Sequence, residues 1–317
     1  MITKISTADM SRDEWVASRK GTIGGSDAAT IIGLNQWSSP YALWAEKTGR
    51  VPEQEDNEKM RQGRDLEEYV AQRFCEETGK KVRRCNYTMC NSDYPWAHAN
   101  IDRAIIGEDA GLECKTTTSL RLSSFKNGEY PLNYYVQSMH YLAVTGKARW
   151  YIAVLILGVG FKWFCVERDE DEIAELMRAE YEFSKYLEDD TPPPIDGSEA
   201  TTKSINDCYG TDIASTDEVT PLDECEEGLE RIIALEREIS ALTNIVNEEK
   251  NKIKAKLGHT VEGESIRFRA TWKPQTRKTF DAARFAADHP ELDLSNYYKQ
   301  STYRVFNLKQ KEIETNG

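Results

Sequence analysis

Two carboxylates and a lysine lie close together in one short part of the chain. Asp102 ends the run Ala-Asn-Ile-Asp, and Glu113 and Lys115 follow after a turn that contains glycine. Side chains two residues apart in a strand point to the same face, so Glu113 and Lys115 should project together while Cys114 turns away. If the strands on either side of the turn pair as a hairpin, Asp102 falls beside Glu113.

Two carboxylates on neighbouring strands form the kind of hard-oxygen site that suits Mg²⁺ or Mn²⁺. The backbone carbonyl of Cys114 offers a third ligand. A lysine on the same face can orient or deprotonate a water, or stabilise charge in a transition state. Exposed hairpins also carry such residues as solvated charges, but the apolar neighbours Leu112 and Ala104 to Ile106 favour a site with a function.

Two predicted helices carry further polar candidates. Gln137 and Tyr141 are one helical turn apart and therefore share a face. Gln137 can hold the lysine or a phosphate oxygen, and Tyr141 can stack or hydrogen-bond near bound DNA. The alternative is that Tyr141 is a core aromatic and Gln137 a surface residue. Glu67 and Glu68 on a second helix either add a carboxylate to the metal site or are solvated.

The elements that must position these residues mix helices and strands. Helical spacing and end signals predict long helices over residues 57–78, 131–145 and 170–187. Alternating or β-branched runs predict strands over 81–89, 97–106, 111–115, 149–157 and 162–166. Helices flanking a short mixed sheet predict an α/β fold, and we assign residues 1–190 to this domain.

The rest of the chain differs in character. Three prolines from Pro192 stop the last helix, and residues 191–220 are rich in Ser, Thr, Asp and Gly, which predicts a linker. Residues 221–258 form a predicted long amphipathic helix, either half of a helical hairpin or a coiled-coil arm. Residues 259–317 predict a small basic α+β tail with the order strand, strand, helix, strand, the last strand over Tyr303 to Leu308.

Composition excludes several classes of protein. The net charge of −13 over 317 residues argues against a DNA-binding module with a basic surface, but not against an enzyme that grips DNA locally. Seven scattered cysteines do not form a disulfide framework or an iron–sulfur motif. The chain has no apolar run of membrane-spanning length and no signal-peptide pattern, so we expect a cytoplasmic protein without a membrane partner.

The candidate residues resemble, in order, the motifs of the YqaJ-type viral recombinases, which are relatives of phage lambda exonuclease in the PD-(D/E)XK nuclease superfamily. The resemblance covers about residues 10–165. It rests on Arg19 with Ile23 to Asp27, Gly63 to Glu67, Ile101-Asp102, Leu112 to Lys115, and Gln137 to Tyr141. Ile101 stands where the name of the superfamily has proline.

The resemblance implies a PD-(D/E)XK nuclease core and a role for each matched residue. Asp102, Glu113 and the Cys114 carbonyl would bind one or two Mg²⁺ ions, with Mn²⁺ as a substitute. Glu67 rather than Glu68 would support a metal or its water, and Lys115 would activate the nucleophile.

Two further residues would bind the substrate, since Arg19 and Ser26 match the motif that holds the 5′ phosphate of the digested strand. The implied activity is a metal-dependent exonuclease that digests linear double-stranded DNA 5′→3′ and exposes a 3′ strand for phage recombination. Its partners would be duplex ends, a phage single-strand annealing protein and further copies of the chain, in a ring if the enzyme is processive. An endonuclease or single-strand nuclease of the same superfamily, and a non-catalytic DNA-binding or partner-recruiting protein, are the alternatives.

Overall fold

The computed structural model describes residues 1–11, 14–15, 18–19, 21–52, 56–210, 219–299 and 304–311. The chain divides into two compact units, Met1–Gly210 and Thr211–Gly317. The division lies beyond residue 190, where the sequence predicts the end of the first domain.

A five-stranded mixed sheet forms the centre of unit 1. Its strands are, in spatial order, β3 (Val82–Arg84), β6 (Arg103–Ile105), β7 (Ala110–Thr118), β8 (Arg149–Leu157) and β9 (Gly160–Glu167). Strands β7 and β8 run parallel and are connected by helix α5 (Leu132–Thr145), whereas the other neighbours are antiparallel. The mixed sheet with flanking helices that the sequence predicts is therefore present.

A second sheet has four strands in the order β1 (Ile2–Ser6), β4 (Tyr87–Asn91), β5 (Tyr94–Asn100) and β2 (Ile23–Gly24). The predicted strands over 81–89 and 97–106 are each wrong as single strands, because the chain crosses there from one sheet to the other. Residues 85–86 separate β3 from β4, and residues 101–102 separate β5 from β6. Asp102 therefore lies at a crossing point and not inside a strand.

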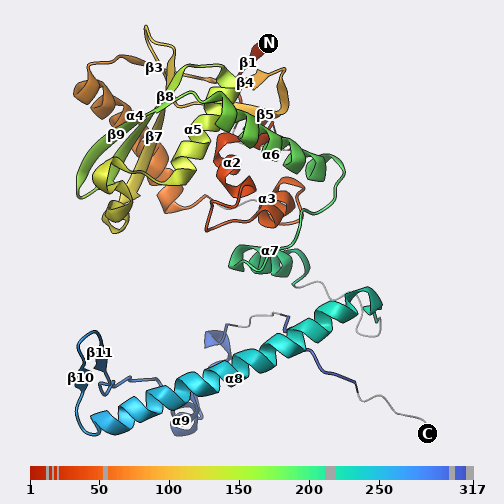
Figure 1. Cartoon of the computed structure of the whole chain (residues 1–317), viewed down its shortest axis with the longest axis vertical. Helices are drawn as coiled ribbons and strands as arrows, with labels where there is room; N and C mark the ends of the chain where they lie inside the picture. Colours follow the sequence, from red (N-terminus) through yellow and green to blue (C-terminus); the bar gives the residue numbers. More distant parts are fainter. Residues whose placement is uncertain are drawn as a thin grey trace. The chain divides into compact units, whose positions relative to one another are not determined.

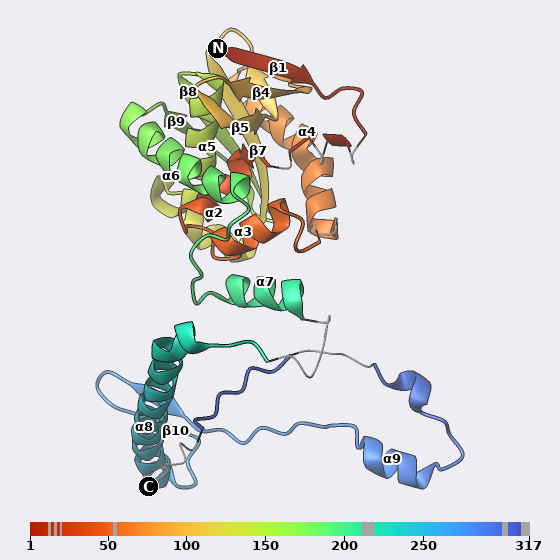
Figure 2. The same cartoon turned by 90° about the vertical axis from the view of Figure 1, so that its right-hand side faces the viewer.

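Helices cover both faces of the five-stranded sheet (Figures 1 and 2). Helix α4 (Glu58–Thr78) packs on one face through a cluster that contains Val70, Phe74, Leu112 and Ala153. Helix α5 packs on the other face, in a cluster with Trp150, Ile152 and Val154, and α6 (Glu170–Glu188) lies beyond it. Because Leu112 faces α4, Glu113 and Lys115 must face α5.

The helix ends follow ordinary capping chemistry. Asn57 accepts hydrogen bonds from the backbone N–H groups of Lys59 and Met60 and so begins α4. Gly79 and Gly146, both in the left-handed conformation, end α4 and α5. Of two shorter helices, α2 (Gly25–Ile31) packs against α5 and β5, and α3 (Pro40–Lys47) packs against α2 and α6.

The predicted linker over 191–220 contains a helix, α7 (Glu199–Tyr209), which the sequence reading missed. Ser198 caps it by accepting from the N–H of Thr201, and the Thr201 hydroxyl donates to Ser39 Oγ at 2.7 Å. Ile205 packs against the cluster of Tyr41 and its neighbours. The helix is short, and its two buried residues, Thr201 and Ser204, are small and polar.

Unit 2 is dominated by α8 (Glu226–Leu257), which corresponds to the predicted helix over 221–258. Strands β10 (Glu262–Glu264) and β11 (Arg269–Thr271) form a hairpin, followed by α9 (Ala282–Asp288) and the short helix η3 (Ser295–Tyr297). The predicted final strand is wrong for residues 304–308, which are irregular, and Tyr303 lies outside the described residues.

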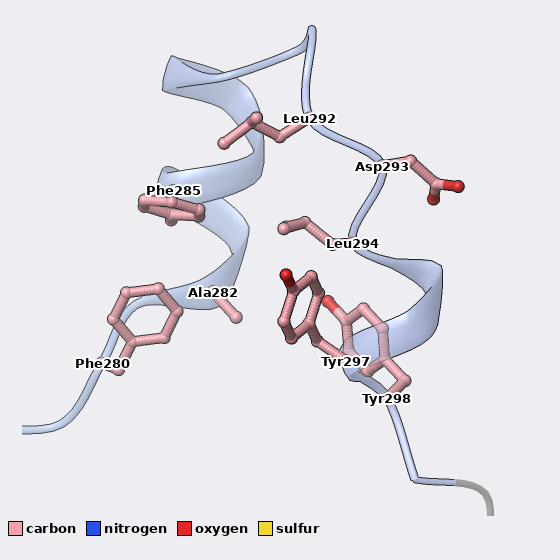
Figure 3. A pocket seen from close by; sticks show the side chains of 8 residues that line it. All are labelled: Phe280, Ala282, Phe285, Leu292, Asp293, Leu294, Tyr297 and Tyr298. Atoms are coloured by element: carbon pink, nitrogen blue, oxygen red, sulfur yellow. The ribbon is translucent and has the colours of Figure 1, made fainter.

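A cavity of about 560 Å³ opens between α9 and η3 in unit 2. Figure 3 shows Phe285 and Ala282 on one wall and Leu294 and Tyr297 on the other, with Asp293 directed outward. None of the described residues of unit 2 is buried, in contrast to unit 1. No helix in the described parts of the chain is long and apolar enough to span a bilayer.

Candidate active site

The expected cluster on β7 is present. The Nζ atom of Lys115 donates to Glu113 Oε1 at 2.8 Å, so the two side chains project together. Cys114 turns to the opposite face and packs against the α4 cluster. Glu113 is 7% exposed, while the Lys115 side chain retains 23% exposure. Lys115 therefore connects a buried carboxylate to solvent.

Asp102 joins this cluster from the crossing point between the two sheets. Strand β6 pairs with β7 so that Arg103 lies opposite Leu112, which puts Asp102 beside Glu113. The Cys114 N–H donates to Asp102 Oδ2 at 2.8 Å. The expected neighbourhood of the two carboxylates is thus present, since β6 and β7 pair as the expected hairpin and Asp102 immediately precedes β6.

Burial and mutual repulsion make this carboxylate pair unusual. Burial, followed by the charges of Glu113 and Glu67, raises the pKa of Asp102 well above its ordinary value. Burial alone would lower the pKa of Lys115, but the neighbouring Glu113 and Asp102 charges outweigh it and raise that pKa. The Glu113 Oε2 atom is buried and has no hydrogen-bond partner. Such unpaired, repelling oxygens are what a bound cation relieves.

The donor chemistry fits one hard divalent cation. Asp102 and Glu113 supply carboxylate oxygens. Cys114, whose carbonyl is the third expected ligand, follows Glu113 on β7, and its N–H binds Asp102. Among the described residues, however, no group of three or more His, Cys, Asp or Glu side chains comes close enough to hold a metal ion. A site here would consist of two carboxylates completed by backbone and solvent oxygens.

Glu67 is near this pair but is already engaged. Arg103 Nη1 donates to its carboxylate, and Arg103 Nη2 also binds Glu68 Oε2 at 2.9 Å. Glu67 belongs to α4, on the sheet face opposite to Glu113, and this explains why the structure does not gather it with the other two carboxylates. Its charge still acts on Asp102.

Gln137 and Tyr141 contact the site differently from the sequence reading. Gln137 Nε2 donates to Glu113 Oε1 at 2.8 Å and to the Tyr141 hydroxyl at 2.9 Å, so it holds the glutamate and not the lysine. Tyr141 is 6% exposed and packs on the Trp150 ring with centroids 4.9 Å apart. The Tyr141 ring is therefore part of the core, as in the alternative interpretation, and its contact with DNA stays a prediction.

Arg19 precedes β2, and Ser26 lies in the first turn of α2, which follows β2 directly. Arg19 Nε donates to His98 Nε2 at 3.4 Å, and the Arg19 guanidinium covers the Trp15 ring at 4.4 Å. Strand β2 pairs with β5, and Gly24, two residues before Ser26, lies opposite His98. Ser26 is exposed. The structure thus has an arginine before β2 and an exposed hydroxyl at the start of α2.

His98 is a residue that the sequence reading missed. Burial, then the Arg19 cation, lowers its pKa to about 3, so the ring is neutral. Because Nε2 accepts from Arg19, Nδ1 carries the proton and donates to Thr22 Oγ1 at 2.9 Å. A lone histidine in a strand carries no sequence signal for such a role.

Gly25, the first residue of α2, lies next to the helix that binds the carboxylate cluster. A Cβ atom on Gly25 would lie 2.6 Å from Tyr141 Cε1 and 3.2 Å from Gln137 Cγ. The backbone of α2 at Gly25 therefore packs directly against the side chains of Tyr141 and Gln137 on α5. Gln137 is the residue that binds Glu113. The glycine-rich turn was visible in the sequence, but the helix against which it packs was not.

A family model described as the YqaJ-like viral recombinase domain matches residues 14–148, a range that includes every candidate residue named above. The solved structure of an alkaline exonuclease (LHK-Exo) from Laribacter hongkongensis is similar, with a TM-score of 0.50 and 23% identity. The match covers 56% of this chain and 93% of that one. This likeness shows that unit 1 has the PD-(D/E)XK nuclease fold.

The similarity also extends beyond the nuclease core. The uncharacterized protein YqaJ of Bacillus subtilis (strain 168) is 37% identical over 311 residues, which is 96% of each chain. The shared region therefore includes most of unit 2 as well as unit 1. The chain belongs to the YqaJ-like viral recombinase family.

Proposed function

We propose that the chain is a metal-dependent exonuclease that digests linear double-stranded DNA from its 5′ ends and leaves a 3′ strand. The observation that carries this proposal is the buried, unpaired Oε2 atom of Glu113 beside Asp102, with Lys115 bound to the same carboxylate. The neighbour of the same fold is, by its name, an alkaline exonuclease.

The chain's own residues divide the work of phosphodiester hydrolysis. Asp102 and Glu113 would hold Mg²⁺ or Mn²⁺, one or two ions, with the Cys114 carbonyl as a further ligand. A bound ion would polarise the phosphate and acidify a water. Lys115, at the solvent edge of the cluster, orients that water or stabilises charge on the phosphate.

Two neighbours keep this cluster in place. Gln137 fixes the orientation of the Glu113 carboxylate through its 2.8 Å hydrogen bond. Glu67 acts from α4 through its charge and through Arg103. We propose that both are positioning residues and that neither one binds the metal directly.

The proposed 5′→3′ direction depends on Arg19, which precedes β2, and on Ser26, which lies in the first turn of α2. A terminal phosphate is a dianion that an arginine and a hydroxyl bind well. Arg19 is held by His98, and Ser26 is exposed in the first turn of α2. We propose that this pair binds the 5′ phosphate, so a duplex with a 5′ hydroxyl should be digested more slowly.

The decisive experiment compares substrates and variants with Mg²⁺ present. Wild type should release nucleotides from linear duplex with a 5′ phosphate and leave covalently closed circles intact. Lys115→Ala should lose about 100-fold or more in rate while remaining folded by circular dichroism. Lys185→Ala, a surface lysine on α6 paired with Glu182, is the matched control and should remain fully active.

Other outcomes assign the alternatives. Cleavage of closed circles would indicate an endonuclease, and preference for single strands a single-strand nuclease. Full activity of Lys115→Ala would contradict the proposed role of the cluster. No hydrolysis of any substrate with Mg²⁺ or Mn²⁺ would indicate a non-catalytic DNA-binding protein.

The proposed reaction also implies a partner. Its product is a 3′ single strand, which in phage recombination is bound by an annealing protein. We propose that a phage annealing protein binds the strand that this enzyme exposes. In a coupled assay, purified annealing protein should protect the exposed strand and speed the joining of complementary ends. Equal joining by digested and undigested DNA would contradict this order of events.

A further inference from the structure

The C-terminal part of unit 2 combines exposed aromatic side chains with positive charge. Residues 265–311, which we call the basic aromatic segment, contain ten lysines and arginines and only four aspartates and glutamates, whereas the whole chain has a net charge of −13. All the large aromatic side chains that are exposed in the described part of unit 2 belong to this segment, and they are Phe268, Trp272, Phe280, Tyr297, Tyr298 and Phe306.

Positive charges lie beside these rings. Each of the six aromatic residues has a lysine or an arginine within two positions in the sequence. The Arg267 guanidinium lies 5.6 Å from the centre of the Phe268 ring, and Lys254 Nζ, on α8, lies 5.9 Å from that of Trp272. The segment therefore offers aromatic faces and cations together, and not as separate patches.

The cavity between α9 and η3 gathers several of the rings. Phe280 and Phe285 line it from the side of α9, with ring centroids 5.2 Å apart, and Tyr297 lines it from η3 (Figure 3). Its volume of about 560 Å³ lies within the range of about 300–1,000 Å³ that is usual for ligand sites. Because Tyr297 is 85% exposed, its ring is not part of a core. The cavity can therefore accept a flat ring such as a nucleobase.

The charges near this cavity favour an anionic ligand. The carboxylate of Asp293 accepts a hydrogen bond from the N–H of Ser295 at 2.9 Å and is directed outward from the cavity. Lys278 and Lys299 each lie within two residues of a ring that lines the cavity, and neither has an ion-pair partner among the described residues. A ligand with flat rings and phosphates would match both features.

We propose that the basic aromatic segment binds single-stranded DNA, with bases stacked on its exposed rings and phosphates bound by its lysines and arginines. Proteins that bind single strands combine these two features, and every base has a face that can stack. Duplex DNA covers the faces of its bases and would use the cations alone. The binding itself does not depend on nuclease activity. That the bound strand is the 3′ strand left by digestion rests on the proposed function.

Fluorescence anisotropy of a labelled oligo(dT) of about 15 nucleotides tests the binding, with full-length protein in EDTA. The double variant Tyr297→Ala, Tyr298→Ala should weaken binding roughly 100-fold, because each stacked base contributes about 10-fold or more. Its binding to a duplex of the same length should not change. The control Tyr297→Phe, Tyr298→Phe keeps both rings and should bind oligo(dT) like wild type.

Salt dependence tests the cations. The double variant Lys278→Gln, Lys299→Gln should reduce the slope of log affinity against log salt concentration by about 1.4, since each phosphate contact on a single strand contributes about 0.7. The control Lys185→Gln, Lys203→Gln removes two lysines of unit 1 that are paired with carboxylates, and it should leave the slope unchanged.

Several results would contradict the proposal. Wild-type affinity of the Tyr297/Tyr298 alanine variant for oligo(dT) would exclude stacking and would assign the cavity to a protein partner. An equal loss of duplex binding in that variant would exclude a preference for single strands, and tighter binding of oligo(rU) would exclude DNA as the ligand. Unchanged helix content by circular dichroism confirms that the variants are folded. Lys115→Ala should still bind oligo(dT), so a failure of the proposed nuclease is distinguishable from a failure of this segment.

Discussion

Gly25 is the position at which a single added methyl group should disturb the candidate site most clearly. The change Gly25→Ala places a Cβ atom 2.6 Å from Tyr141 Cε1, 2.9 Å from its Cζ and 3.2 Å from Gln137 Cγ. Ordinary carbon contacts are about 3.5–4.0 Å, so the neighbours must move by roughly 1 Å. Gly25 does not have a positive φ, so the conflict is with packing and not with backbone conformation.

The surroundings decide how that movement is taken up. Tyr141 is buried and lies against Trp150, which is itself fully buried, so the ring has little room to retreat. Overpacking of this kind costs about 1–3 kcal/mol of folding free energy. For a unit of about this size that is a fall in melting temperature of roughly 2–10 °C. Movement of Gln137 also breaks or bends its 2.8 Å bond to Glu113.

Displacing a catalytic group by about 1 Å costs on the order of 100-fold in rate. We therefore expect Gly25→Ala to lose roughly 100-fold in kcat/KM on linear duplex and a few degrees in melting temperature. The matched control is Gly63→Ala inside α4, where the nearest atom to a new Cβ is Thr116 Oγ1 at 3.8 Å. That change should stabilise the protein by about 0.5–1 kcal/mol through helix propensity. A Gly25→Ala protein as active and as stable as wild type would refute the packing argument.

Three further predictions concern charge and domain boundaries. Because the folded pKa of His98 is about 3 and its ordinary value is 6.5, the unfolded chain takes up a proton first as pH falls. Urea unfolding should therefore show about 2 kcal/mol less stability at pH 5 than at pH 7.5, and this loss should shrink in His98→Asn. Asp102→Asn should raise the melting temperature in EDTA by a few degrees, because it removes a buried charge that its neighbours repel. The same change should abolish stabilisation by Mn²⁺. In wild type this stabilisation reaches about 2.7 kcal/mol when the Mn²⁺ concentration is 100 times Kd. A fragment of residues 1–210 should melt like unit 1 of the full chain, whereas residues 1–190 should melt lower because α7 no longer covers α3; equal melting of both fragments would make α7 dispensable.

Local periodicity was sufficient for the parts of the site that depend on one element. The two-residue spacing of Glu113 and Lys115 predicts their common face, and the structure has it. The four-residue spacing of Gln137 and Tyr141 predicts theirs, and the two side chains are hydrogen-bonded to each other. The helices that carry these residues also begin and end near the predicted positions, because their caps are encoded locally.

Properties that depend on which elements meet were beyond such reasoning. The break at Ile101 and Asp102 is not marked by glycine or proline, because the chain changes sheets there without a tight turn. The engagement of Glu67 by Arg103 occurs because Arg103, opposite Leu112, points to the face of the sheet that α4 covers. The burial of Tyr141 follows from the contact of α2 with α5, which needs Gly25.

Helix α5 connects the two halves of the proposed site. Gln137 on α5 binds Glu113, and one turn later His140 binds the carbonyl of His98 through Nε2 at 2.9 Å. The His98 ring in turn accepts from Arg19. His140 is fully buried and its other ring nitrogen is 2.8 Å from Glu180 on α6, so this connection is packed from all sides.

A rigid connection of this kind has a consequence for the proposed reaction. If Arg19 holds the terminal phosphate and Glu113 marks the cleavage position, the distance between them is set by α5 and the strand that carries His98, and not by a loop. A fixed distance from the strand end to the hydrolysed bond favours products of one length, removed repeatedly from the end. The same rigidity makes internal cutting of closed DNA unfavourable, because a closed strand offers no phosphate end for Arg19. The packing around α5 is thus a physical reason to expect an exonuclease from this arrangement of residues.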